Sequence, residues 1–253
     1  MHALKARRTG VTKSPRAPAA AGAERPARTA QPGLAALESR APPTLNEEAY
    51  RRLEELIVTL ELAPGSVVSE AILSERIGIG TTPIREALQR LSREYLIQIL
   101  PRRGVIVTGI DVRQQLQVLE TRRELDRLIA RAAARRGQGA DRVRFTEIAR
   151  TMGRAVAAGD THAFLRADGE LNTALANAAR NEIAARTVAT LHSVSRRFWF
   201  FHRNDHPGAA ATMRLHVAFA KALAGGDEDG VATASDALID DLAEFARSTV
   251  GGM

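Results

Sequence analysis

Between residues 46 and 108 the chain holds three short helix-like segments followed by strand-like ones, and this order limits the fold more than any other feature. Apolar residues recur every three or four positions after Asn46, the expected N-cap of the first helix, which runs to about residue 62. A second helix is predicted from Ser69. A third opens at Thr82, whose hydroxyl is suited to cap it before Pro83.

The strand-like part is a predicted hairpin. Residues 96–100 and 104–108 alternate in polarity and are rich in β-branched side chains. Three short helices followed by a hairpin are typical of a winged helix-turn-helix domain, predicted here over residues 44–109. The pattern alone leaves open any other small helical domain, because caps and apolar periodicity occur in all of them.

The second half of the chain is predicted to be entirely helical. Caps and glycines divide it into segments that begin near residues 111, 141, 160, 181, 208 and 227. Over residues 110–250 we therefore expect a helical bundle of about 140 residues. The predicted fold class is mostly α, with a winged helix-turn-helix before an all-α bundle.

Residues 1–43 differ in composition from the rest. They carry eight of the Lys and Arg residues against two Glu, and six of the ten prolines. Such a segment buries too little apolar surface to offset its ordering entropy, so we expect a disordered basic tail. A mitochondrial presequence is the alternative, although prolines interrupt an amphipathic helix. The remaining chain is nearly neutral, so basicity alone does not establish nucleic-acid binding.

Composition also excludes several classes of site. The chain has no cysteine, which rules out disulfides, cysteine-bound zinc, iron–sulfur clusters and a thiol nucleophile, and which fits a reducing cytoplasm. No apolar run reaches the roughly 18 residues that a membrane-spanning helix needs. We expect a soluble, cytoplasmic protein.

The residues of the first module resemble the GntR family of bacterial transcription regulators. The family pattern is roughly PGxxLSE, then LGVSRTPVREAL, then RxGxxV, and residues 64–70, 82–88 and 102–104 follow it. The resemblance implies a homodimer on a pseudo-palindromic operator, with the third helix in the major groove of double-stranded DNA.

The resemblance also implies the DNA contacts. Arg85, at the third position of the predicted helix, is the expected base-reading residue, with a solvated surface charge as the alternative. The full expected set is Thr81, Thr82, Arg85, Arg90, Arg102 and Arg103. The family usually has an arginine where this chain has Ala71, and Ser-Arg where it has Gly80–Thr81. Both missing arginines normally contact DNA, so either the operator differs from the usual one or the basic tail supplies compensating phosphate contacts.

The second half resembles the FCD effector-binding domain of the FadR branch of that family. The matching residues are Arg122, Asp126, Asp168, Leu171, Asn181, His216 and Asp227. Relatives that bind a metal such as zinc or nickel use an Asp and a His four residues apart and two further His. Here Asp168 and His216 remain, whereas Asn172 and Leu238 stand at the other two positions.

The implied metal site is therefore degenerate. Asn172 is a poor zinc ligand and Leu238 offers none, while Asp240 or Asp241 would complete the shell only if the last helix were rotated. Asp168 and His216 would otherwise form a buried hydrogen-bonded pair or contact an effector. The other histidines, which have no clear partners in the sequence, are expected to be surface or structural: His162, His192, His202 and His206.

Arg122 and Arg196 fall where FCD relatives line their pocket. A buried guanidinium is costly unless it meets an anion, so a small organic acid is the expected effector. An internal salt bridge between Arg122 and Asp126 is the alternative. Trp199 is a candidate to close the pocket. The expected effector-binding set is Arg122, Asp168, Asn172, Arg196 and His216.

The leading hypothesis is an effector-responsive transcription regulator, with a repressor as its expected form, and not an enzyme. No Ser-His-Asp spacing, P-loop, GxGxxG or HExxH motif occurs in the sequence. Two alternatives remain: a metal-dependent hydrolase built on Asp168 and His216, and an architectural DNA-binding protein without a ligand.

Overall fold

The computed structural model describes residues 44–204 and 208–249, which lie in one compact unit, Pro42–Met253. The expected basic tail, residues 1–43, lies outside the described residues. Among the described helices, none is long and apolar enough to cross a membrane.

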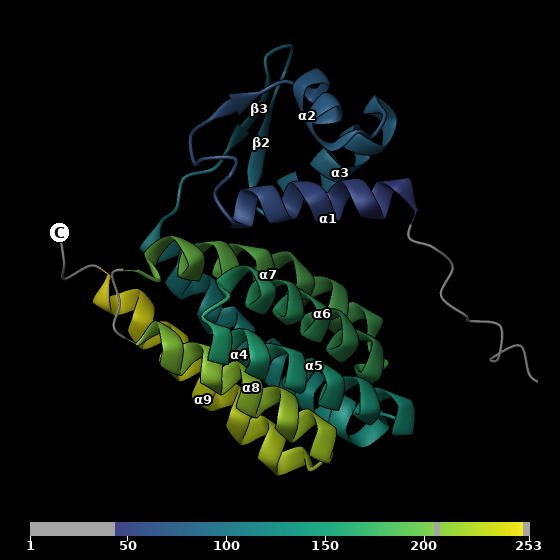
Figure 1. Cartoon of the computed structure of the whole chain (residues 1–253), viewed down its shortest axis with the longest axis vertical. Helices are drawn as coiled ribbons and strands as arrows, with labels where there is room; N and C mark the ends of the chain where they lie inside the picture. The colour runs from purple at the N-terminus through teal and green to yellow at the C-terminus, as the bar shows by residue number, and fades with distance from the viewer. Residues whose placement is uncertain (1–43, 205–207, 250–253) are drawn as a thin grey trace, which may run out of the picture. The chain divides into compact units, whose positions relative to one another are not determined.

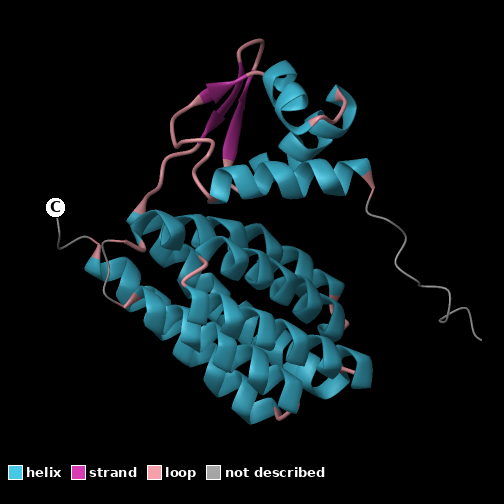
Figure 2. Ribbon diagram, viewed as in Figure 1, coloured by secondary structure: helices cyan, strands magenta, loops and turns pink. Residues whose placement is uncertain are grey.

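The first module is a winged helix-turn-helix domain, as predicted. Its elements are α1 (Leu45–Val58), β1 (Val67–Val68), α2 (Glu70–Ile77), α3 (Thr81–Arg93), β2 (Ile97–Leu100) and β3 (Gly104–Val107). The strands form an antiparallel sheet in the order β1-β3-β2, drawn in magenta in Figure 2. The apolar faces of the three helices meet the inner face of this sheet in a core that includes Leu53, Ile84 and Val105.

The start and end of α1 differ from the prediction. Thr44, not Asn46, is the N-cap: its hydroxyl accepts from the Glu47 amide, and the Glu47 carboxylate accepts from the Thr44 amide. This reciprocal pair satisfies two orphan backbone donors, which an Asn46 cap followed by Ala49 at N3 would not do. The helix ends at Val58 instead of near residue 62, and Leu60 has a φ of 64°.

The predicted cap of α3 is also wrong. The helix begins at Thr81 after Gly80, and no side chain caps it. Pro83 then lies at the third helical position, where its missing N–H would have had no intrahelical partner in any case. Arg85 is consequently the fifth residue of the helix and not the third.

The sheet has one strand more than the predicted hairpin. In the short β1, Val67 pairs with Ile106 and Val68 with Val105. Gly104 permits this approach because a Cβ there would lie 2.5 Å from the Val68 carbonyl oxygen, and because its φ is 94°. The glycine after the two wing arginines is therefore a structural requirement of the sheet.

The second half is the predicted bundle of helices, shown side by side in Figure 1. Its elements are α4 (Val112–Arg136), α5 (Gly139–Ala158), α6 (Thr161–Ala179), α7 (Glu182–His202), α8 (Ala209–Gly225) and α9 (Glu228–Ser248). Four of the predicted starts are confirmed by side chains that accept from a backbone amide in the first turn: Asp111, Asp160, Asn181 and Asp227.

Helix α4 is central to the bundle and packs on α6, α7 and α9. Towards α9 it carries four arginines spaced four residues apart, each paired with an acidic residue: Arg123 with Asp240, Arg127 with Asp236, Arg131 with Asp229, and Arg135 with Glu228. Such partly exposed pairs contribute little individually. Below them the apolar faces form one core around Ile129, Phe145, Phe164 and Phe245.

Candidate functional site

Helix α3 offers a polar face at its N-terminal end. Thr81, Thr82 and Arg85 are exposed there, while Ile84 and Leu88 are buried on the opposite side. Because no side chain caps the helix, its first amides are available to an anion such as a DNA phosphate.

The Arg85 guanidinium is held by Glu70 at the start of α2. Its Nη2 donates to the Glu70 carboxylate over 2.8 Å, and its side chain stays 66% exposed. The carboxylate stabilises the charged guanidinium and raises the pKa of Arg85. Arg85 is thus oriented by its neighbour and still accessible to a ligand.

Arg90 is also paired with neighbouring side chains, and its own side chain is 44% exposed. Its guanidinium lies 3.5 Å from the centre of the Tyr50 ring, and its Nε donates to Glu94 over 3.0 Å. The Tyr50 hydroxyl donates to the same carboxylate over 2.7 Å. Arg90 therefore ties α1 to the C-terminal end of α3.

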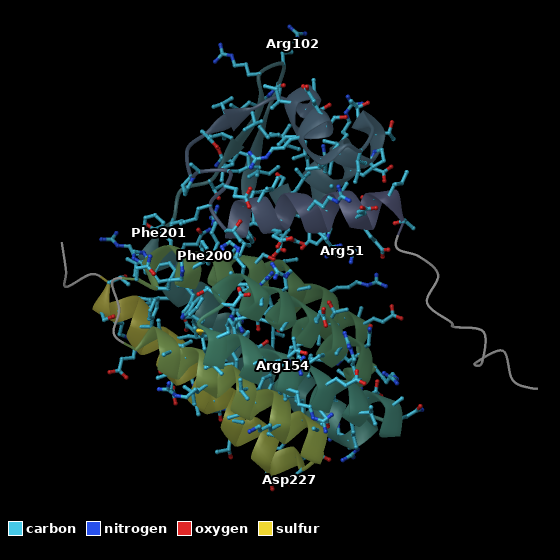
Figure 3. All side chains as sticks on the ribbon, viewed as in Figure 1. Arg51, Arg102, Arg154, Phe200, Phe201 and Asp227 are labelled. Carbon is cyan, nitrogen blue, oxygen red and sulfur yellow. The ribbon has the colours of Figure 1, made fainter. Side chains whose placement is uncertain are left out.

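The wing presents two further cations. Arg102 and Arg103 are exposed in the turn between β2 and β3. Figure 3 shows Arg102 at the tip of this turn, pointing away from the strands. Their placement suits contacts with a minor groove or with the phosphate backbone.

The helical domain contains a cavity of about 30 Å³, which has room for at least one ordered water molecule. All five predicted effector-binding residues line this cavity. The polar side chains around it are Arg122, Asp126, Asp168, Asn172, His192, Ser195, Arg196, His216 and Ser235. Phe164, Trp199 and Leu238 are among the apolar ones.

One side of the cavity is a buried ionic cluster. Arg122 donates to Asp126 through Nε and Nη2, over 3.0 and 2.9 Å, and His192 Nε2 lies 3.1 Å from the other Asp126 oxygen. Burial alone would raise the pKa of Asp126, but Arg122 and His192 outweigh it and lower the pKa to about 2. The salt bridge weighed as an alternative for Arg122 is present.

On the other side, Arg196 is shared between two carboxylates. Its Nη1 donates to Glu54 of α1, its Nη2 donates to the Leu165 carbonyl over 2.7 Å, and its Nε lies 3.2 Å from Asp168. Burial by itself would lower the pKa of Arg196, and the two carboxylates raise it above its usual value. Asp168 also lies 3.7 Å from His216 Nε2, while the Asn172 amide donates to it over 3.5 Å.

Two residues that line the cavity each carry an N–H group with no hydrogen-bond acceptor among the described residues. Arg196 Nε is close to Asp168 but outside hydrogen-bonding geometry, and Trp199 Nε1 has no partner. Both atoms are buried, and their residues lie three positions apart on α7. Unpaired buried donors are rare because each costs the desolvation of a polar group.

The residues around Asp168 and His216 do not fit a resident divalent metal. Within the part of the chain that the structure describes, no three His, Asp or Glu side chains are grouped to hold an ion. The Arg196 guanidinium beside Asp168 would repel a cation. The two substitutes considered above point elsewhere, since Asp240 pairs with Arg123 and Asp241 accepts from the Thr212 hydroxyl.

One pocket residue and one partner of a pocket residue could not be assigned to the site from the sequence. His192 was expected to be surface or structural, yet it binds Asp126 and lines the cavity. Its position four residues before Arg196, on the same face of one helix, was the available signal. Glu54 carried no comparable signal, because its partner lies 142 positions away.

Arg197, next to Arg196, holds the segment that follows β3. It is 1% exposed and donates to the carbonyls of Leu96, Thr108 and Gly109 and to the Thr108 hydroxyl, over 3.0 to 3.4 Å. Burial lowers its pKa to about 10, so it remains charged at neutral pH. Consecutive residues of α7 thus serve the cavity and the linker.

Known proteins agree with both halves of this description. Residues 45–107 match the model of bacterial regulatory proteins of the gntR family, and residues 117–241 match that of the FCD domain. The HTH-type transcriptional repressor RspR of Escherichia coli (strain K12) is 26% identical over 83% of this chain and 93% of its own. An HTH-type transcriptional regulator of Streptomyces ambofaciens is 40% identical over 68 residues, which are 27% of this chain and 29% of that protein.

The solved structures support the fold. Escherichia coli McbR/YncC has a TM-score of 0.64 at 19% identity, over 83% of this chain and 97% of that one. A GntR transcriptional regulator from Rhodococcus sp. RHA1 has a TM-score of 0.56 at 18% identity, over 83% of this chain and 100% of that one. None of these findings supports the hydrolase alternative. The chain belongs to the GntR family of bacterial regulatory proteins, with an FCD domain as its second half, and is a DNA-binding transcription regulator and not an enzyme.

Proposed function

We propose that this regulator binds a small organic acid in the cavity of its FCD domain and that the acid changes its affinity for an operator. The supporting observation is the pair of unpaired buried donors, Arg196 Nε and Trp199 Nε1, on one wall. A carboxylate would accept from both, and charge-assisted hydrogen bonds are the stronger kind. A cavity of about 30 Å³ must widen to admit such a ligand, because pockets for organic molecules are about tenfold larger.

The proposed form of the regulator is a cytoplasmic homodimer that acts as a repressor on a pseudo-palindromic operator. One winged helix offers few base and phosphate contacts, and a two-fold pair doubles them. In each half-site Arg85 would contact a base, Thr81 and Thr82 phosphates, and Arg102 and Arg103 the minor groove or backbone. Arg90 remains a proposed contact of this set, since its side chain is 44% exposed although it is engaged with Tyr50 and Glu94.

The chain carries its own reporter for ligand binding. Trp199 is the single tryptophan, so a ¹H–¹⁵N spectrum contains one indole N–H signal from this residue. Acetate titrated over the millimolar range is expected to shift that signal saturably, because the indole gains an acceptor. Acetamide, which has the same shape without the charge, is expected to leave it in place. Equal shifts with both compounds, or none with either, would remove the carboxylate from the proposal.

Replacing Arg85 by alanine is expected to weaken operator binding by about 1–3 kcal/mol and to relax specificity at one position of each half-site. The physical reason is that a side chain accessible at the start of α3 reads one base edge. Affinities for the operator and for single-base variants of it, measured by fluorescence anisotropy, would test this.

The matched control is Arg186→Ala. Arg186 is also an exposed arginine paired with a glutamate, Glu182, but it lies at the start of α7 in the FCD domain. The substitution Arg186→Ala is expected to leave the affinity for the operator unchanged. A similar loss in both variants would show that net charge, and not base reading, explains the effect.

We further propose that the regulator works without a stoichiometric metal, since Asp168 and His216 alone hold a divalent ion weakly. Protein purified without added metal is expected to contain substoichiometric zinc or nickel, and chelators should leave its melting temperature nearly unchanged. Asn172→His combined with Leu238→His should create tight zinc binding. One equivalent of metal in the unmodified protein, found by elemental analysis, would contradict this proposal.

A further inference from the structure

Arg196 connects three helices through one guanidinium. The side chain belongs to α7, its partners Leu165 and Asp168 belong to α6, and its partner Glu54 belongs to α1 of the DNA-binding domain. Both carboxylates are nearly buried, with Glu54 8% and Asp168 4% exposed. Arg196 therefore compensates both charges, with Asn172 and His216 as further neighbours of Asp168.

The Nε atom of this guanidinium lies 3.2 Å from an Asp168 oxygen, in a geometry that does not form a hydrogen bond. Nη1 and Nη2, by contrast, are engaged with Glu54 and Leu165. The five N–H groups of an arginine are fixed in one plane. Because the fork is rigid, a shift that brings Nε to an acceptor in the cavity also displaces Nη1, which now donates to Glu54.

We propose that Arg196 is the positioning residue that couples the cavity to the DNA-binding domain, because Glu54 and a bound carboxylate compete for its guanidinium. The inference rests on the proposed function of the cavity as a carboxylate site. It adds the contact through which ligand binding in the cavity affects α1.

The contacts of α1 carry the change onward to the recognition helix. One turn before Glu54, the Tyr50 hydroxyl donates to Glu94, the C-cap residue of α3, and the Tyr50 ring stacks under Arg90. A buried carboxylate that loses its cation is unfavourable, so Glu54 must either take up a proton or reach water, and in the proposed coupling α1 shifts until Glu54 reaches water. Because Tyr50 contacts Arg90 and Glu94, that shift of α1 also moves the C-terminal end of α3.

Competition has a reciprocal consequence. If a carboxylate ligand weakens the Glu54 contact when it binds, removal of the Glu54 charge should strengthen ligand binding, because the ligand no longer has to break that contact. A side chain that only supported the fold would not raise the affinity of a ligand when it is replaced.

Glu54→Gln in the full chain tests the coupling, with Glu55→Gln as its control. Glu55 is the next residue of α1 and also pairs with an FCD arginine, Arg166, but at the exposed surface over 3.5 Å. With acetate as the probe and the Trp199 indole signal as the readout, Glu54→Gln is expected to raise acetate affinity about fivefold or more. Glu55→Gln is expected to leave it unchanged.

Hydrogen exchange without ligand separates the two proposals. Amides of α1 are expected to exchange faster in Glu54→Gln than in Glu55→Gln. If acetate shifts the indole signal but both variants bind it equally, the coupling is overturned and the carboxylate site stands. If acetate does not bind, the proposed carboxylate site is contradicted. If, in addition, the α1 amides exchange equally fast in both variants, the role of the Glu54–Arg196 contact is contradicted as well. Should Glu54→Gln not fold, Glu54→Asp, which shortens the side chain, takes its place with the same expected directions.

Discussion

Asp126→Asn is expected to lower the free energy of unfolding by about 3–5 kcal/mol, because it leaves the buried Arg122 charge without its counter-ion. Arg122 and Asp126 are 6% and 5% exposed, so water cannot replace the lost carboxylate without opening the bundle. In a domain of this size, such a loss corresponds to a fall in melting temperature of about 10 °C. Thermal and urea unfolding followed by circular dichroism would measure it.

A double variant distinguishes a stranded charge from a general defect of packing. Arg122→Met with Asp126→Leu removes both charges and fills similar space, so most of the lost stability should return. The pH dependence gives a second check. Because the pKa of Asp126 is lowered to about 2, its contribution is complete above its unfolded value near 4 and is lost as the pH falls towards 2. The difference between the wild-type chain and Asp126→Asn should shrink over this interval.

Arg197→Ala is expected to cost about 3 kcal/mol and to expose the linker at residues 108–111 to proteases. The substitution leaves the carbonyls of Thr108 and Gly109 without the donors that now satisfy them. Urea unfolding and limited proteolysis with mass spectrometry would measure the two effects.

Two further variants identify the cause. Arg197→Met keeps most of the volume and also removes the cost of burying a charge that has no carboxylate partner, so it should be less destabilising than Arg197→Ala. Arg186→Ala, at an exposed position of the same helix, should change neither stability nor proteolysis. Full stability in Arg197→Met would show that the hydrogen bonds to the linker contribute nothing net.

Local signals in the sequence were enough for most of the fold. Helix starts were predictable because a short polar side chain before a helical pattern of apolar residues usually caps the first backbone amides. This holds at Asp111, Asp160, Asn181 and Asp227. The signal for Thr44 was also present, since a threonine followed three residues later by a glutamate is a capping box. The prediction of Asn46 as a single-residue cap is wrong because the cap is formed by a pair, Thr44 and Glu47.

Contacts between distant segments could not be predicted in this way. The strand β1 has only two residues, too few for an alternating pattern. Its pairing with β3 depends on Gly104, which leaves room for the Val68 carbonyl. Whether Arg90 faces DNA or the aromatic ring of Tyr50 depends on how α1 crosses α3, which no local pattern encodes. The Glu54–Arg196 pair likewise joins two domains that were predicted separately.

One turn of α7 serves two tasks, and this limits how new ligand preferences can arise in such a protein. Arg196 and Trp199 face the cavity, while Arg197 between them holds the linker. A substitution that reshapes this wall also alters the attachment of the DNA-binding domain. Asn172 on α6 and Leu238 on α9 line the cavity away from that turn. Substitutions on these two helices can therefore change ligand specificity without altering the attachment of the DNA-binding domain. A new specificity that arises there keeps the existing response to ligand.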